Sequence, residues 1–148
     1  DLHRASRRQR QMCIRDRNNY GQLGIGSTTQ TYPSGTMPWT DLGSNRTVSQ
    51  LSAGNNFNCA IIDGGDVKCW GLNNYGQLGL GSYTTWGGSS SEMGDNLPTL
   101  ALGQPAVDVS AGSNHACAVL LDGTLKCWGY NNYGQLGLGC TPLQPRLE

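Results

Sequence analysis

The residues best suited to do chemistry in this sequence are four cysteines that form two pairs with the same spacing. Nine residues separate Cys59 from Cys69, and nine separate Cys117 from Cys127. Such pairs could form disulfides, remain reduced as small buried apolar groups, or bind a metal. Zinc is disfavoured, because structural zinc sites typically place two to four residues between cysteines.

The spacing within each pair fits a β-hairpin in which the two cysteines face each other. This register leaves three-residue loops at 63–65 and 121–123. Such loops often combine a type I turn with a left-handed residue, and glycine stands at that third position as Gly65 and Gly123. Opposed Cα atoms lie about 4.5–5.5 Å apart, so we expect a disulfide within each pair, with reduced thiols as the alternative. Each would stabilise the fold by about 2.5–3 kcal/mol in the chain-entropy model.

The remaining titratable and glycine-rich motifs do not indicate catalysis. The two histidines are His3 and His115, and His115 stands where the preceding copy of the repeat described below has Phe57, which favours packing. The decapeptide NNYGQLGIGS has no Gly-Lys-Ser/Thr ending and so is not a phosphate-binding loop. We therefore expect no enzyme activity, no cofactor and no metal.

The elements that position the cysteines belong to an internal repeat. The decapeptide at 18–27 recurs at 73–82 and 131–140, and residues 52–81 match 110–139 at 20 of 30 positions. Periods of this size are typical of propellers, solenoids and arrays, whose units need neighbours to bury their apolar faces. The predicted organisation comprises a head at 1–17, units at 18–72 and 73–130, and the start of a third at 131–148.

The pattern within a unit is that of short strands, and no segment has a sustained helical period. We expect an all-β fold with about four antiparallel strands per unit, the number in a propeller blade. No run of 18 apolar residues is present, so no membrane association is predicted. The strands of the first unit are expected at 39–42, 48–51, 59–62 and 67–70, and those of the second at 97–102, 107–109, 117–120 and 125–128.

The segments that do not recur, 28–37 and 83–96, are rich in Ser, Thr, Gly and Pro and are predicted loops. Partner-specific contacts usually lie in loops, and Trp86 and Tyr83 are the candidate contacts, although Trp86 could instead pack its loop onto the blade. Asn45 begins a glycosylation sequon, which matters if a eukaryote secretes the protein.

The charge distribution argues against a nucleic-acid partner. From residue 18 onward there are four basic and eight acidic residues, whereas six arginines lie in the head. Residues 8–16 resemble translated sequencing-adapter sequence, so we expect the head to be artefactual or disordered; a nucleic-acid-binding arm is the other interpretation. Because the chain starts at Asp1, without Met or a signal-like apolar segment, we expect its native N-terminus and any targeting signal to lie upstream.

The motifs SAGxxxxCA, DGxLKCWG and NNYGQLGLG, which lie within 18–140, closely resemble repeats of the regulator of chromosome condensation. The resemblance implies a seven-bladed propeller with four-stranded blades, of which this chain would supply about two. It also implies a range of functions: nucleotide exchange on a small GTPase, enzyme inhibition, or protein interaction. The paired cysteines are more like those of secreted or bacterial-type members.

We therefore expect a non-enzymatic protein-interaction module in an extracellular or other oxidising compartment, with a protein partner of unknown identity. One alternative is a nuclear or cytosolic guanine-nucleotide exchange factor. Another is a secreted enzyme inhibitor or adhesion-type protein.

Overall fold

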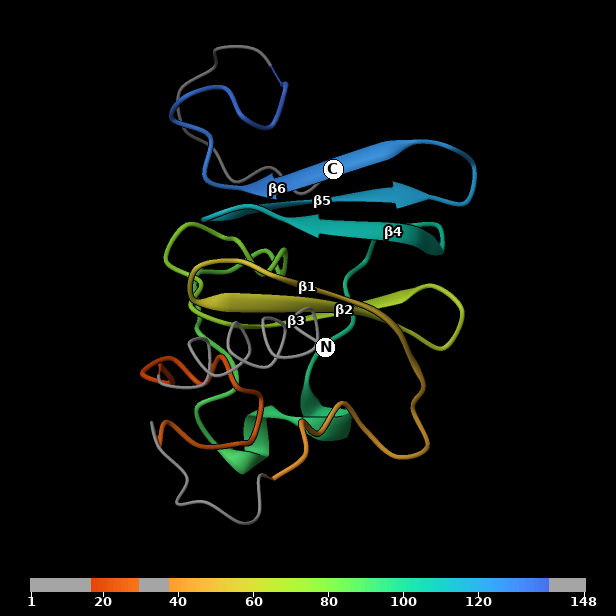
Figure 1. The fold of residues 1–148 in the computed structure, drawn as a ribbon. Coiled ribbons are helices and arrows are strands. Elements are labelled where there is room, and N and C mark those ends of the chain that lie inside the picture. The colour runs from red at the N-terminus through yellow and green to blue at the C-terminus, as the bar shows by residue number, and fades with distance from the viewer. Residues whose placement is uncertain (1–16, 30–37, 139–148) are drawn as a thin grey trace, which may run out of the picture.

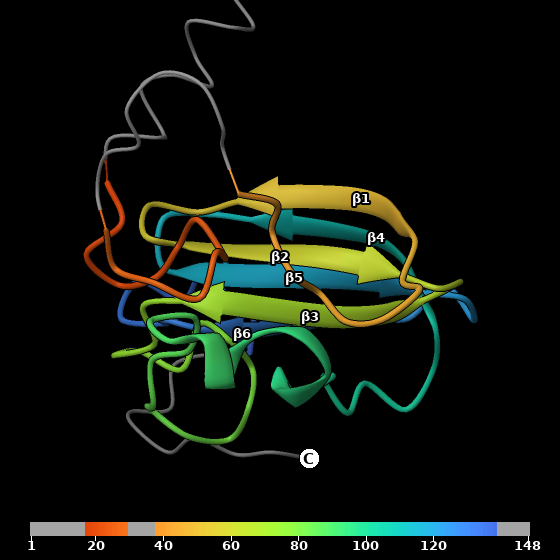
Figure 2. The same ribbon diagram turned by 90° about the horizontal axis from the view of Figure 1, so that it is seen from below.

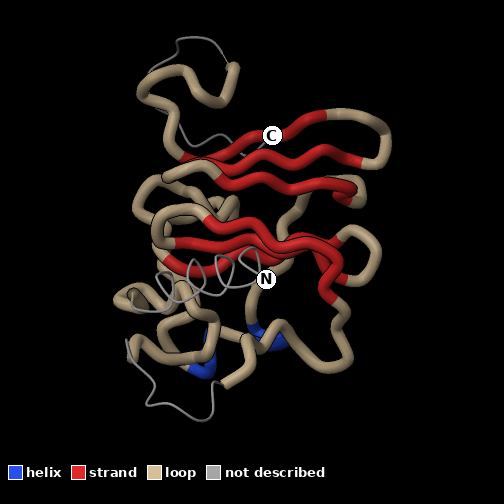
Figure 3. Tube along the Cα trace, viewed as in Figure 1, coloured by secondary structure: helices blue, strands red, loops and turns tan. Residues whose placement is uncertain are grey.

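The computed structural model describes residues 17–29 and 38–138, and Figure 1 shows two antiparallel sheets stacked on each other. The first sheet, blade 1, contains β1 (Val48–Ala53), β2 (Phe57–Ile62) and β3 (Asp66–Gly71). The second, blade 2, contains β4 (Ala106–Ala111), β5 (His115–Leu120) and β6 (Leu125–Gly129). The helical content of these described ranges is two 3-10 turns, η1 (Ser90–Glu92) and η2 (Gly94–Asn96), coloured blue in Figure 3. The predicted all-β class is confirmed.

Among the described residues each blade has three strands rather than the expected four. In blade 1 the position of a fourth strand is occupied by Thr99, which forms an isolated bridge with Lys68, and by Leu100, whose N–H donates to the Val67 carbonyl at 2.8 Å. The chain cannot continue this pairing because Pro98 lacks an N–H and a tight Leu102-to-Leu100 hydrogen bond bends it away. Residues 38–42 form no strand either.

The core lies on both faces of blade 1. Strand β2 alternates its side chains, so Cys59 and Ile61 face blade 2 whereas Ala60 and Ile62 face the other way, and all four are buried. Figure 2 shows the strands of the two blades stacked in the same order. The cluster between the blades contains Phe57, Cys59, Ile61, Val67, Cys69, Leu78, Leu100, Ala106, Val109, Ala116, Ala118 and Leu120. The cluster on the outer face of blade 1 contains Leu42, Ala60, Ile62, Trp70, Met93 and Leu97.

Side chains of β1 join the two sheets by bonding to the backbone of β4. The Gln50 amide donates to the Val109 carbonyl at 3.0 Å and accepts from the Val109 N–H at 3.2 Å. The Ser52 hydroxyl accepts from the Ala111 N–H at 2.8 Å. These bonds fix the stagger of blade 2 on blade 1.

The hairpin register agrees with the sequence-based expectation in both blades. Cys59 faces Cys69 and Cys117 faces Cys127, with Cα–Cα distances of 4.1 and 4.0 Å, and the structure joins the sulfur atoms of each pair. The remaining cysteines, Cys13 and Cys140, lie outside the described residues, as do residues 1–16 and 139–148.

The two hairpin loops have the predicted length but different turn geometry. In the loop at 121–123 only Gly123 has a positive φ, 83°, as expected for a type I turn followed by a left-handed residue. In the loop at 63–65 all three residues have a positive φ, including Asp63 at 46°. Two consecutive glycines permit this path, and aspartate tolerates the left-handed region better than most residues.

No helix in the described ranges is long and apolar enough to cross a membrane.

Candidate functional site

The polar residues that recur in the decapeptide hold the loop together. In the second copy the Asn73 carboxamide accepts from the Leu78 N–H at 2.9 Å and donates to the Ser82 and Thr84 carbonyls at 2.8 and 2.9 Å. The first copy repeats this arrangement around Asn18, and in the third Asn131 accepts from the Leu136 N–H. Asn18 and Asn73 are fully buried, so their role is structural.

The recurring glutamines and tryptophans complete the scaffold. Gln22, Gln77 and Gln135 each accept from the backbone N–H of the tyrosine two residues earlier. The Trp70 indole N–H donates to the Gln22 carbonyl at 3.0 Å, and the Trp128 N–H donates to the Gln77 carbonyl at 2.9 Å. The first and second decapeptides are therefore each docked on the blade that follows them.

A tyrosine ring is presented to solvent by each of these loops. The exposed fraction is 39% for Tyr20, 43% for Tyr75 and 87% for Tyr133. Tyr130 links two of them: its ring centroid lies 4.7 Å from that of Tyr75 and 6.0 Å from that of Tyr133, both in edge-to-face geometry. Such pairs are favourable beyond their burial. The rings thus form a contiguous cluster across the boundary of blade 2.

The three loops project from the same side of the stack. Figure 1 shows them on the left, in orange-red, yellow-green and blue, while the hairpin loops lie on the right. The loop segments 18–29, 72–86 and 130–138 contain no charged residue. We call the tyrosines on this side the tyrosine surface, which comprises Tyr20, Tyr75, Tyr83, Tyr130 and Tyr133.

The candidate contacts from the sequence have different outcomes. Tyr83 is 58% exposed and follows the second decapeptide, in the segment whose Ser82 and Thr84 carbonyls accept from Asn73. Trp86 is not the exposed contact expected, because its backbone pairs with Gly71 in both directions and its partly buried ring packs against both core clusters. The alternative, that Trp86 packs its loop onto the blade, describes its surroundings.

Buried Lys68 is a polar residue that the sequence did not single out. Its ammonium group donates to the Leu42 carbonyl at 2.9 Å and to the Gly94 carbonyl at 2.8 Å, and only 2% of the residue is exposed. Burial lowers the pKa of this lysine below its ordinary value. Lys68 ties the segment before β1 and the 83–97 segment to the edge of β3, which explains why that non-recurring loop packs on the blade.

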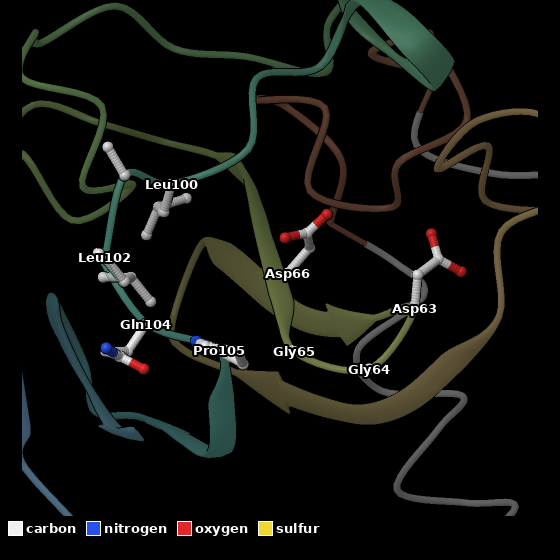
Figure 4. Close-up of a pocket in the computed structure, with 10 residues that line it drawn as sticks. Asp63, Gly64, Gly65, Asp66, Leu100, Leu102, Gln104 and Pro105 are labelled. Atoms are coloured by element: carbon white, nitrogen blue, oxygen red, sulfur yellow. The ribbon is translucent and has the colours of Figure 1, made fainter. Parts of the chain in front are cut away.

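A surface pocket of about 380 Å³ lies at the opposite end of blade 1, where Leu100–Pro105 passes the hairpin loop. Figure 4 shows Asp63 and Asp66 on the hairpin side and Leu100, Leu102 and Gln104 on the other wall. No group of three or more metal-ligating side chains occurs in the part of the chain that the structure describes.

The Asp63 carboxylate in this pocket is already engaged. It accepts from the Thr47 N–H at 2.8 Å and pairs with the Arg46 guanidinium at 2.7 Å. The hydrogen bond from the Thr47 N–H and, to a smaller extent, the contact with Arg46 lower the pKa of Asp63. The pairing with Asp63 in turn raises the pKa of Arg46. Asp63 thus joins the hairpin loop to the segment before β1, whereas the pocket itself lies between the hairpin loop and Leu100–Pro105.

Comparison with known proteins identifies the repeat. Profiles described as "Regulator of chromosome condensation (RCC1) repeat" match residues 17–61 and 64–119, and a second such profile matches 48–77 and 106–135. Among curated proteins, human "Probable E3 ubiquitin-protein ligase HERC4" is 36% identical over 91 residues, which are 62% of this chain and 8% of that protein. A Dictyostelium discoideum "Bifunctional serine/threonine-protein kinase/NEDD4-like E3 ubiquitin-protein ligase" is 35% identical over 136 residues, 82% of this chain and 7% of its own length.

Solved structures show the same fold. Human WBSCR16 superposes with a TM-score of 0.64 at 26% identity, over 81% of this chain and 29% of that one. Prp20p of Saccharomyces cerevisiae, whose structure was described with its binding to Gsp1p and histones, superposes with a TM-score of 0.60 at 24% identity, over 84% and 30%. The chain therefore spans less than a tenth of these curated relatives and under a third of these structures. With profile matches over more than half its length, it belongs to the regulator of chromosome condensation (RCC1) repeat family, and its two blades are a fragment of a β-propeller.

Proposed function

We propose that this chain is part of a non-enzymatic protein-interaction module whose partner binds the tyrosine surface. The observation that carries the proposal is the contiguous cluster of Tyr75, Tyr130 and Tyr133 on loops without charged residues. Tyrosine supplies a large, rigid contact area at low entropic cost, and Tyr, Ser, Gly and Asn dominate antibody binding loops for this reason. The same four residue types dominate the exposed loops here.

The chemistry of this surface restricts the kind of partner. Burying an unpaired charge is costly, and these loops offer no charged side chain to pair with one. We infer that the partner presents an uncharged, partly apolar protein surface. The side chains of Asn73, Gln77 and Trp70 are engaged in scaffold contacts, whereas the exposed tyrosine rings are available to bind a partner.

The module is proposed to work in an oxidising compartment. The support is the repeated, directly opposed position of two cysteines in both blades. Alkylation of the native protein before reduction, followed by mass spectrometry, tests this. We expect all four repeat cysteines to be protected from alkylation, and four freely alkylated thiols would contradict the proposed compartment.

Binding is tested by paired capture with the full chain immobilised. Quantitative mass spectrometry would compare proteins retained from secreted material by the wild type, Tyr75→Ala and Leu121→Ala. Leu121 is 66% exposed and lies in the 121–123 hairpin loop, on the side opposite the tyrosine surface, which makes it a control for loss of an exposed large side chain. We expect a protein that is retained by the wild type and by Leu121→Ala but is lost with Tyr75→Ala. Equal retention by all three would refute the assignment of this surface.

The exchange-factor alternative is distinguished by different measurements. It requires reduced cysteines and a measured acceleration of nucleotide release from a small GTPase. The activities named for the curated relatives are not transferred to this chain, because it covers less than a tenth of their length.

A further inference from the structure

We propose that Asn45 is an acceptor for an N-linked glycan and that this glycan marks the hairpin side of the module as the side that does not bind the partner. Asn45 begins the sequence Asn-Arg-Thr at 45–47, the only Asn-X-Ser/Thr sequence in the chain. The proposal rests on the oxidising compartment proposed above, because N-linked glycans are added along the secretory route.

The local structure presents Asn45 and immobilises its neighbours. On one side of it, the Ser44 N–H and hydroxyl donate to the Asp95 carboxylate at 3.2 and 3.0 Å. On the other, Arg46 and the Thr47 N–H bind Asp63. Asn45 itself has φ 58°, is exposed, and makes no side-chain hydrogen bond among the described residues. The turn is thus pinned on both sides while the acceptor carboxamide remains free.

The position of Asn45 keeps a glycan away from the tyrosine surface. The bonds from Arg46 and Thr47 to Asp63 place the turn beside the 63–65 hairpin loop. That loop precedes β3, whereas the decapeptide loop follows the other end of the same strand at Gly71. Figure 1 shows the segment that leads into β1 on the hairpin side, opposite the tyrosine surface. A bulky glycan there leaves the tyrosine rings accessible.

The transfer requires one co-reactant, a lipid-linked diphosphate oligosaccharide, and an oligosaccharyltransferase. The Asn45 carboxamide nitrogen bonds to C1 of the first sugar while the bond from C1 to the phosphate oxygen breaks. The lipid diphosphate leaves, and one amide proton passes to the enzyme's base. The Thr47 side chain, which completes the sequon, is exposed as well.

The test uses the full chain directed into the endoplasmic reticulum of cultured eukaryotic cells by an added leader, with an independent sequon on an appended tail as an internal standard. We expect two glycans, one of them on Asn45, with Asn45 converted to aspartate by peptide N-glycosidase. Asn45→Gln and Thr47→Ala should each remove one glycan, whereas Arg46→Lys should keep both.

A chain that carries the tail glycan but an unmodified Asn45 would overturn the proposal. Disulfide mapping on the same product separates this failure from failure of the proposed function. Unmodified Asn45 with both cysteine pairs oxidised refutes only the glycan, whereas a glycan on Asn45 with free repeat cysteines refutes only the disulfide-stabilised module.

Discussion

Blade 1 and blade 2 are built from nearly the same sequence, yet their equivalent residues have different surroundings. Blade 1 is covered on one face by blade 2 and on the other by the first decapeptide and the 83–97 segment, so Phe57, Cys59 and Val67 are at most 1% exposed. Their equivalents in blade 2 are half-buried His115, half-buried Cys117, and Leu125, which is 64% exposed. Burial in this protein is therefore set by the neighbouring unit and not by the strand's own sequence.

This contrast separates two kinds of exposed apolar residue. The residues exposed on the outer face of blade 2 correspond to buried residues of blade 1, so they have the character of a surface for packing against another repeat. Tyr20 and Tyr75 remain about 40% exposed even though their loops are docked on a blade. Exposure that persists when a neighbour is present is the better indication of a partner-binding surface.

The largest difference in the free energy of unfolding is expected for alanine substitutions at a position that is buried in blade 1 and half-buried in blade 2. Phe57 packs over Gly54 and fills the space between the blades, and His115 packs over Gly112 in the same way. Phe57→Ala should lower the free energy of unfolding by about 3–5 kcal/mol because it leaves a cavity. His115→Ala should cost about 1 kcal/mol or less.

Urea denaturation of the full chain measures both values. Equal losses for the two variants would show that the blades do not pack on each other as described.

A smaller difference is expected for the asparagines that hold the decapeptides. Asn73→Ala removes a fully buried side chain and leaves the buried Leu78 N–H and two carbonyls without their partner, which should cost about 2–3 kcal/mol. Asn131 is only half-buried, so water can replace its bonds and Asn131→Ala should cost about 1 kcal/mol. The same denaturation series tests the pair, and a larger loss for Asn131→Ala would reverse the comparison.

The sequence predicts features that depend on contacts within one unit. The spacing of the cysteines and the glycine at position 123 are sufficient to predict the hairpin register, because turn length and strand pairing are local. The bonds from the glutamines to the backbone are local as well.

Features that depend on contacts between segments are not predictable in this way. A lysine at position 68 would be expected to face solvent. It is buried instead, because its ammonium group donates to carbonyls from two distant segments. Trp86 is partly buried, because its backbone pairs with Gly71 and its ring packs against both core clusters. The tyrosine of the decapeptide recurs, which by itself suggests a structural role. Its ring is nevertheless exposed, and it is the Tyr75 backbone N–H that donates to Gln77.

The two disulfides should differ in how fast they are reduced. Both disulfides close loops of equal length, so the chain-entropy model gives them the same contribution to stability. They differ in burial, because Cys59 and Cys69 are fully buried under blade 2 whereas Cys117 and Cys127 are half-buried. A reductant must reach the sulfur atoms, so the buried pair requires local opening. We expect the Cys117–Cys127 bond to be reduced at least about tenfold faster, which corresponds to an opening cost of about 1.4 kcal/mol or more.

Timed reduction at neutral pH, quenched by alkylation and analysed by mass spectrometry, gives the two rates. The reverse order would mean that blade 2 does not protect blade 1.

The smallest effect is expected from acid, and it again distinguishes the two blades. The pKa of Asp63 is lowered by the Thr47 N–H and by Arg46, and that of Asp122 is lowered by the hydroxyl and N–H of Thr124. Because the folded pKa lies below the unfolded one, each carboxylate stabilises the fold above its ordinary pKa, and this contribution is lost as pH falls below about 4. Asp63 ties its loop to a separate segment, whereas Asp122 closes only its own loop.

Acidification should therefore accelerate hydrogen exchange at the Thr47 amide and through the turn before β1, but in blade 2 the change should stay within residues 122–124. Asp63→Asn should reproduce the first effect at neutral pH, since asparagine tolerates the left-handed backbone at this position but carries no charge for Arg46. Asp122→Asn is the matched control and should leave the Thr47 amide unchanged. If neither acid nor Asp63→Asn alters exchange at Thr47, the hairpin loop of blade 1 is not what holds the turn that presents Asn45.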